Sequence, residues 1–169
     1  MLPIEAELDK KTSAAGTSLW LSLVLGLLAF GLDRLHKVVQ LDVLGWRGGE
    51  WIEVLPVFDY VLVWNSGVSY GLLSSVPTAL LLAIVAAAML LLGWWWWRTH
   101  SSLTRCGLAL CLGGALSNAV DRAVYGAVAD FFHFHVGGWS FYIFNLADAS
   151  ITAGVVLLLL DALRPAGEG

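Results

Sequence analysis

The chain has 169 residues, of which 59% are hydrophobic and 13% are charged; its net charge is −4 and its mean hydropathy is +0.78. Soluble domains carry about 25% charged residues, so this composition indicates an integral membrane protein, with room for one domain. No run of Lys or Arg is longer than two residues. The basic surface typical of nucleic-acid-binding proteins is therefore missing, and we expect no nucleic-acid partner.

Four apolar segments approach the roughly 20 residues that a helix needs to cross a bilayer. They cover approximately residues 18–35, 77–97, 103–121 and 140–163. The first segment ends in the polar stretch 33–37 and has no small-residue cleavage site after it, so we interpret it as a retained helix. We predict an all-α membrane protein in which residues 1–169 form a single domain, a bundle of four transmembrane helices.

The two longer connections, 33–76 and 121–139, are expected to face outward, and the first contains sequence typical of a small sheet. Residues 50–54 and 58–64 are rich in Trp, Ile, Val and Tyr, and turn-forming residues at 48–49 and 65–67 bound them. Such runs predict strands joined by a turn. We expect a small extracytoplasmic β-sheet beside the helices.

The orientation rests on the even number of predicted helices and on the loop 98–105. An even number of crossings places both termini on one side. Although Lys and Arg are nearly balanced between the two sides, the loop 98–105 carries Arg98 and Arg105 and no acid. Because basic loops stay in the cytoplasm, we place this loop and both termini there. The tryptophans 94–97 then lie at the cytoplasmic interface, where we favour membrane anchoring over a ligand site.

Ionisable and amide side chains gather where the predicted helices end on the outer side. A charged side chain at the bilayer centre costs roughly 2.5 to 3.5 kcal/mol, so such residues are candidates for function. On one helix, residues three or four apart share a face. The candidates are Asn118, Asp121, Arg122, Asp130, Asn145 and Asp148. For Asp121 and Arg122 we favour an ion pair that fixes the helix end.

Asp130 and Asp148 have no basic neighbour in sequence, and Asp148 lies eight residues inside the fourth segment, up to about 12 Å along a helix. Two carboxyl groups held close together share a proton, so one acts as a base while the other acts as an acid. Such a pair can activate water for peptide hydrolysis. Spacing alone supports a proton relay in a transporter equally well, and both alternatives stay open at this point.

Other catalytic chemistries have little support in the sequence. It contains neither a His-Glu-x-x-His zinc motif nor a Gly-x-Ser-x-Gly nucleophile motif. His133 and His135 alternate on a short segment beside Asp130, which is compatible with a metal site, but we favour an aromatic patch formed by residues 131–134. We therefore predict no metal ligand.

Three motifs resemble the lipoprotein signal peptidase family, also called signal peptidase II. They are GGALSNAVDR at 113–122, GAVADF at 126–131 and FNLADASI at 144–151. The resemblance implies that Asp130 and Asp148 are the catalytic pair, which favours hydrolysis over the proton relay. It also implies substrate-binding or site-bracing roles for Asn118, Asp121, Arg122, Asn145, Asn65, Asp33 and Lys37. The chain departs from the family at His36, where Ser or Thr is usual, and at Tyr70, where Phe is usual.

The resemblance further implies the reaction and its setting. The chain is expected to be a membrane aspartyl endopeptidase that cleaves diacylglyceryl-modified bacterial prolipoproteins just before the lipidated cysteine. It would need no cofactor, and its partners would be the diacylglyceryl-prolipoprotein substrate and membrane lipid. We expect a monomer in the bacterial cytoplasmic (inner) membrane, with the active site near the outer face.

Overall fold

The computed structural model describes residues 3–67 and 77–164. The helices are α1 (Pro3–Val38), its continuation as the π-helix η1 (Val39–Val43), α2 (Thr78–Arg98), α3 (Ser102–Tyr125) and α4 (Leu146–Ala162). The strands are β1 (Trp51–Leu55), β2 (Phe58–Asn65), β3 (Val128–Val136) and β4 (Trp139–Ser140).

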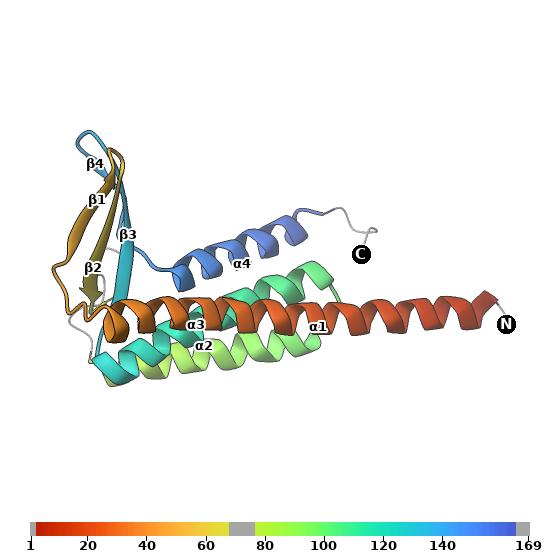
Figure 1. The fold of residues 1–169 in the computed structure, drawn as a ribbon. Coiled ribbons are helices and arrows are strands. Elements are labelled where there is room, and N and C mark those ends of the chain that lie inside the picture. The colour runs from red at the N-terminus through yellow and green to blue at the C-terminus, as the bar shows by residue number, and fades with distance from the viewer. Residues whose placement is uncertain (1–2, 68–76, 165–169) are drawn as a thin grey trace.

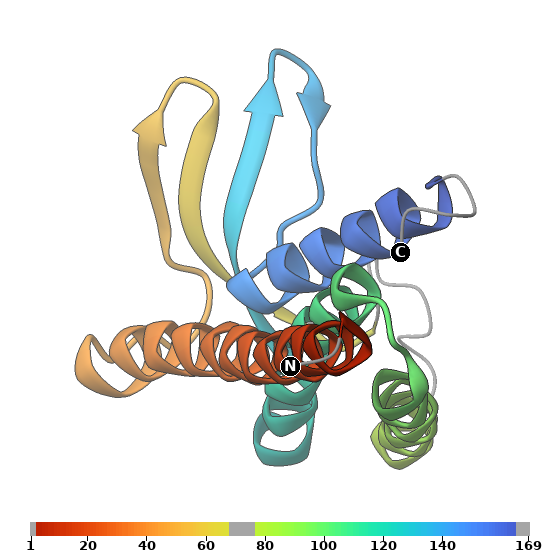
Figure 2. The same ribbon diagram turned by 90° about the vertical axis from the view of Figure 1, so that its right-hand side faces the viewer.

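The four long helices run side by side, and the sheet stands across one end of them (Figure 1). The beginning of α1 and the end of α4 lie at the opposite end, away from the sheet. Helix α3 is the centre of the bundle, because it packs against α1, α2 and α4. The view in Figure 2 shows α2 at the margin of the bundle, separated from α4 by α3. The predicted mostly helical fold with a small sheet is confirmed.

Among the described residues, three helices are long and apolar enough to cross a membrane: Ser18–Val43, Thr78–Arg98 and Ser102–Tyr125. Many of their large apolar side chains point outward; Leu27 is 70% exposed and Leu90 is 76% exposed. Such surfaces would be unfavourable in water and suit contact with lipid. The membrane character predicted from composition is therefore matched by the outer surface of the bundle.

The prediction of a helix from residue 140 was wrong. Residues 139–140 pair with β3 as β4, residues 141–145 lie outside the helix with an isolated bridge from Phe144 to Phe132, and α4 begins at Leu146. The helix starts there because the side chain of Asn145 caps its free N–H groups. Asp148 consequently lies in the first turn of α4 and not eight residues inside a helix. At 1.5 Å per residue the 17 residues of α4 cover roughly 25 Å, slightly less than a typical hydrocarbon core.

The first and third helices also extend beyond the predicted segments. Helix α1 continues without interruption into η1, so Asp33 and Lys37 lie within a helix and not at its end. Helix α3 ends only at Gly126, whose left-handed backbone (φ 76°) terminates the helix, as glycine commonly does. Asp121 is therefore one full turn inside α3 and is completely buried.

The sheet is antiparallel throughout, in the order β1-β2-β3-β4. The predicted strands at 50–54 and 58–64 are confirmed as β1 and β2, whereas β3 was recognised only as a short extended segment around the two histidines. One face of the sheet packs against η1. The buried residues at this contact are Leu41 of η1, Leu62 of β2, and Ala129 and Phe131 of β3. Because β3 follows α3 directly, the sheet holds Asp130 against the end of the helical bundle.

Helices α3 and α4 approach closely through small residues. A Cβ atom added to Gly114 would lie 2.5 Å from the carbonyl oxygen of Ala147, and one added to Gly107 would lie 2.7 Å from that of Gly154. Small residues allow this backbone contact in membrane bundles. The contact at Gly114 sets the position of the first turn of α4, which carries Asp148.

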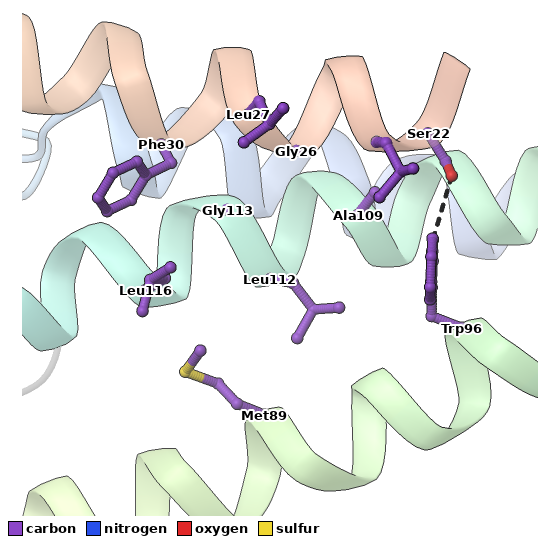
Figure 3. A pocket seen from close by; sticks show the side chains of 11 residues that line it. Ser22, Gly26, Leu27, Phe30, Met89, Trp96, Ala109, Leu112, Gly113 and Leu116 are labelled. Atoms are coloured by element: carbon purple, nitrogen blue, oxygen red, sulfur yellow. Dashed lines mark hydrogen bonds between the residues drawn. The ribbon is translucent and has the colours of Figure 1, made fainter. Parts of the chain in front are cut away.

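An apolar groove of about 380 Å³ lies between α1, α2 and α3 (Figure 3). Leu27, Phe30, Met89 and Leu112 are among its lining residues, and none of the predicted site residues is. At one end of the groove the indole Nε1 of Trp96 donates a hydrogen bond to Ser22 Oγ (3.2 Å). Trp96, one of the four consecutive tryptophans, thus joins α2 to α1.

Candidate active site

Asp130 lies on β3, where the strand meets the helices, and is 2% exposed. Its Oδ1 accepts a hydrogen bond from Asn145 Nδ2 (2.7 Å), and its Oδ2 accepts one from Asn65 Nδ2 (3.1 Å). Two amide side chains, one from β2 and one from the residue before α4, therefore fix the orientation of the carboxyl group.

Asp148 occupies the third position of α4 and is half-buried. It forms a capping box with Asn145: the backbone N–H of Asp148 donates to Asn145 Oδ1 (2.9 Å), and the backbone N–H of Asn145 donates to Asp148 Oδ2 (3.2 Å). Asp148 Oδ1 accepts from Asn118 Nδ2 (2.8 Å). Asn145 thus contacts both carboxyl groups, one through its side chain and the other through its backbone.

A buried ionic cluster supports this site from the side of α1. Lys37 Nζ lies 2.8 Å from Asp33 Oδ2 and 2.6 Å from Asp121 Oδ2, and it donates to Asn118 Oδ1 (3.1 Å). Asp121 also pairs with Arg34. The ammonium group of Lys37, which is 1% exposed, thereby joins α1 to α3 and orients the asparagine that contacts Asp148.

Asp33 connects the same cluster to α4. Its Oδ2 accepts from Ser117 Oγ (2.6 Å), and its Oδ1 accepts from the backbone N–H of Ala147 (3.0 Å). The second contact satisfies one of the free N–H groups at the start of α4. Arg34 and Ser117 were not predicted as site residues, although Arg34 adjoins Asp33 and Ser117 adjoins Asn118 in sequence.

Arg122 and Asn65 hold the segment that leaves β2. A guanidinium nitrogen of Arg122 donates to the backbone oxygen of Gly67 (2.8 Å), and Asn65 Oδ1 accepts from the Gly67 N–H (3.1 Å). Arg122 does not form the predicted ion pair with Asp121, which is bound to Lys37 and Arg34 instead. Tyr70, the second departure from the family motif, lies outside the described residues.

His36, the other departure, faces the sheet. Its Nε2 lies 2.6 Å from the hydroxyl oxygen of Tyr60, and its ring stacks on Phe132. Burial raises the pKa of Tyr60 to about 12, so its hydroxyl stays protonated at neutral pH. His36 therefore joins α1 to β2 and β3. None of these contacts is with Asp130 or Asp148.

Two cavities open beside the aspartates. One, of about 190 Å³, is lined by polar residues, among them Asn118, Arg122 and Asp148, and by apolar residues of α2, α3, α4 and β3. The second, of about 430 Å³, is lined by Asp130 and by residues of the sheet. Asn65 and Tyr142 line both cavities. The two carboxyl groups thus face adjoining spaces where a peptide and water could meet them.

The surroundings of Asp130 favour its protonated form. Burial, and next the nearby charge of Asp148, raise the pKa of Asp130 from 3.8 to about 7, although hydrogen bonds from Asn65 and Asn145 oppose the shift. A carboxyl group with this pKa can hold or release a proton near neutral pH. This property suits a general acid or base.

The structure brings the nine predicted site residues together at one end of the bundle. Eight are linked by direct side-chain contacts: Asp33, Lys37, Asn65, Asn118, Asp121, Asp130, Asn145 and Asp148. Arg122 joins through the backbone of Asn118 and Gly67. Apolar helices with such a buried site define a membrane protein with a pair of aspartates at the junction of bundle and sheet.

Comparison with known proteins identifies this architecture. The family model of signal peptidase (SPase) II matches residues 25–164. The lipoprotein signal peptidase of Methylocella silvestris is 45% identical over 148 residues, covering 84% of this chain and 86% of that protein. The lipoprotein signal peptidase of Rhodopseudomonas palustris is 42% identical over 154 residues, covering 87% and 94%. A solved bacterial membrane enzyme superposes with a TM-score of 0.73 at 25% identity, over 91% of this chain and 94% of that one.

The chain belongs to the signal peptidase II family. It is a membrane protease that removes the signal peptide from prolipoproteins. This result decides between the two alternatives that spacing alone left open, in favour of hydrolysis over a proton relay.

Proposed function

We propose that Asp130 and Asp148 are the catalytic pair of this peptidase. The observation that carries the proposal is the position of Asn145, which bonds Asp130 through its side chain (2.7 Å) and Asp148 through its backbone N–H (3.2 Å). One residue thus fixes both carboxyl groups relative to each other. Precise orientation of this kind is what a reaction with two proton-transferring groups requires.

Before the reaction, the one proton that the two carboxyl groups share lies on Asp130. Burial and the charge of Asp148 keep the pKa of Asp130 near 7, whereas Asp148 lies in the first turn of α4, where the helix dipole and N–H groups stabilise a negative charge. Asp148 then takes a proton from water as the water attacks the peptide carbonyl carbon. Asp130 donates its hydrogen bond to the carbonyl oxygen.

Collapse of the tetrahedral intermediate reverses these roles. The proton taken up by Asp148 passes to the leaving amine nitrogen as the C–N bond breaks, and Asp130 regains the proton that it had shared with the oxyanion. The remaining site residues act by positioning. Asn118 and Asn145 hold the aspartates, Asn65 contacts Asp130, and the Lys37 cluster fixes Asn118.

The helices support a four-span topology with the site near the outer face. Helix α4 is short, but its side chains are largely apolar and it packs against α3 and α1 (Figure 1). With both termini and the loop 98–105 in the cytoplasm, the end of the bundle that carries the sheet faces outward. Reporter fusions at Ser101 and Gly138 should then report opposite sides of the membrane. If they report the same side, the four-span topology is refuted.

The substrate is proposed to be a precursor whose cysteine already carries diacylglycerol. The cavity next to Asp148 supports this assignment because its lining includes the apolar residues Val85, Ala115 and Ile151, which belong to helices α2, α3 and α4. Acyl chains could lie along such an apolar wall while the peptide reaches the carboxyl pair.

A purified enzyme in detergent provides the test of the substrate. We expect it to cleave a diacylglyceryl-modified precursor without an ion gradient and to leave the same precursor uncleaved when its cysteine is unmodified. Signal-peptide release is followed on a gel or by mass spectrometry. Equal cleavage of both precursors would refute recognition of the lipid while leaving the peptidase assignment intact.

A further inference from the structure

Asp59, His133 and His135 form a cluster on the sheet that takes no part in the proposed cleavage. Asp59 on β2 pairs directly with His133 on β3, and His135 follows two residues along the same strand. Side chains two residues apart on a strand share a face, and cross-strand partners are neighbours, so the three side chains must converge. One nitrogen of each histidine and a carboxylate oxygen of Asp59 all lie within 4.8 Å of one another.

His133 lies between Asp59 and Ser140. Its Nδ1 is 3.0 Å from Asp59 Oδ2, and its Nε2 is 2.7 Å from Ser140 Oγ. A neutral imidazole carries a hydrogen on one ring nitrogen and a lone pair on the other. When Nε2 carries the hydrogen and donates to Ser140, the lone pair of Nδ1 faces the Asp59 carboxylate, and a cation between them would satisfy both groups.

His135 repeats this situation from the other side. Its Nε2 is buried and makes no hydrogen bond within the described part of the chain, although it lies 3.1 Å from the same oxygen, Asp59 Oδ2. The cluster thus combines a buried carboxylate with one nitrogen of each histidine close to the same oxygen, and one of these nitrogens lacks a hydrogen bond.

We propose that Asp59, His133 and His135 bind a divalent transition-metal ion, zinc foremost, that clamps β2 to β3. Two ligand atoms at about 2.0 to 2.1 Å from zinc in tetrahedral geometry lie about 3.3 Å apart, close to the 3.0 and 3.1 Å observed. Two histidines and one carboxylate are a common zinc ligand set. Ser140 fits as the outer partner that fixes the ring of a ligating histidine.

Ser140, His133 and Asp59 also follow one another in the order of a serine hydrolase triad. The hydroxyl group of Ser140 also lies within hydrogen-bond distance of the Phe141 carbonyl oxygen (3.2 Å), so His133 is not its sole partner. The metal site accounts for His135 as well, which a triad does not use.

Zinc binding to the full-length protein in detergent tests the proposal. The protein, free of a polyhistidine tag, is stripped with a chelator and titrated with ZnCl₂ by calorimetry, and Co²⁺ is used as a spectroscopic probe of coordination. We expect one zinc ion per chain. Asp59→Asn and His135→Ala should each weaken binding at least about tenfold, while His100→Ala, a substitution of an exposed histidine in the α2–α3 connection, should leave it unchanged.

A second measurement covers the case that a variant folds poorly. Zinc should raise the melting temperature of the wild type and of His100→Ala, and it should not raise that of His135→Ala, whose imidazole is the most exposed of the three ligands. Because Cys106 and Cys111 are present in every variant, they cannot produce this difference. Absence of zinc binding in the wild type, or equal binding in His135→Ala, would overturn the proposal.

Discussion

Replacing Asp130 by asparagine removes a carboxyl group that the folded protein holds in an unfavourable environment. Its pKa is raised from 3.8 to about 7, so the folded state keeps a proton that the unfolded state releases between these values. Stability of the wild type must therefore fall as the pH rises through this interval. Each pH unit corresponds to about 1.4 kcal/mol, which gives a total of roughly 4 kcal/mol above pH 7. Asparagine does not titrate and avoids this loss.

The expected result is a difference in stability between Asp130→Asn and the wild type that depends on pH. Between pH 5 and pH 8 the stability of Asp130→Asn relative to the wild type should rise by roughly 2 to 3 kcal/mol. On the scale of soluble domains of this size, that is a relative gain in melting temperature of roughly 5 to 10 °C. The amide oxygen can accept from one of the two donors, Asn65 and Asn145, while its NH2 group faces the other, so one of these two hydrogen bonds is lost and the fold should persist. Thermal unfolding in detergent at several pH values measures the effect.

A control variant shows whether the pH-dependent gain in stability follows from the loss of Asp130 in particular or from the loss of any carboxylate. Asp42→Asn removes an exposed acid from η1 and should not reproduce the pH-dependent gain. If Asp130→Asn and the wild type respond equally to pH, burial and Asp148 do not perturb Asp130, and its role as the protonated member of the pair fails.

Three further predictions concern the support and the chemistry of the site. Lys37→Ala leaves Asp33 with no ammonium partner and should destabilise the protein by about 3 to 5 kcal/mol, lowering yield and reducing cleavage partially; unchanged melting and activity would contradict the role of the cluster. Gly114→Ala should displace the first turn of α4 and reduce kcat, whereas Gly93→Ala, which meets no atom within 4 Å, should not; equal activities would refute the close contact as a determinant of the site. Cleavage should decline as the pH rises through about 7, because Asp130 must be protonated to donate; a rate that keeps increasing to pH 9 would assign its proton to another group.

The helices and the composition of the site were predictable from local sequence. Long apolar runs identify α1, α2 and α3 because lipid demands about 20 such residues for each span. Asp130 and Asp148 were found because carboxyl groups beside apolar segments need a specific partner. Their gathering at one end of the bundle followed from helix order alone.

Features that depend on tertiary contacts were missed or misplaced. The start of α4 was misjudged because residues 141–144 are apolar and aromatic, and only pairing with β3 and the capping box of Asn145 exclude this stretch from the helix. Asp59 could not be associated with His133, since 74 residues separate them and their register depends on the sheet. Arg34 was overlooked because its partner, Asp121, was expected to pair with Arg122.

Cleavage by the single variants Asp130→Asn and Asp148→Asn and by the double variant tests the proposed catalytic pair most directly. Each protein is purified in detergent, checked for folding by thermal unfolding, and incubated with a diacylglyceryl-modified precursor. Asparagine can neither accept the proton of the water nor return one to the leaving amine, so each single variant should lose at least about 10²- to 10⁴-fold in rate. The double variant should be little worse, because the two groups act as a unit. Substantial cleavage by a folded single variant would remove that residue from the pair and direct attention to Asp121.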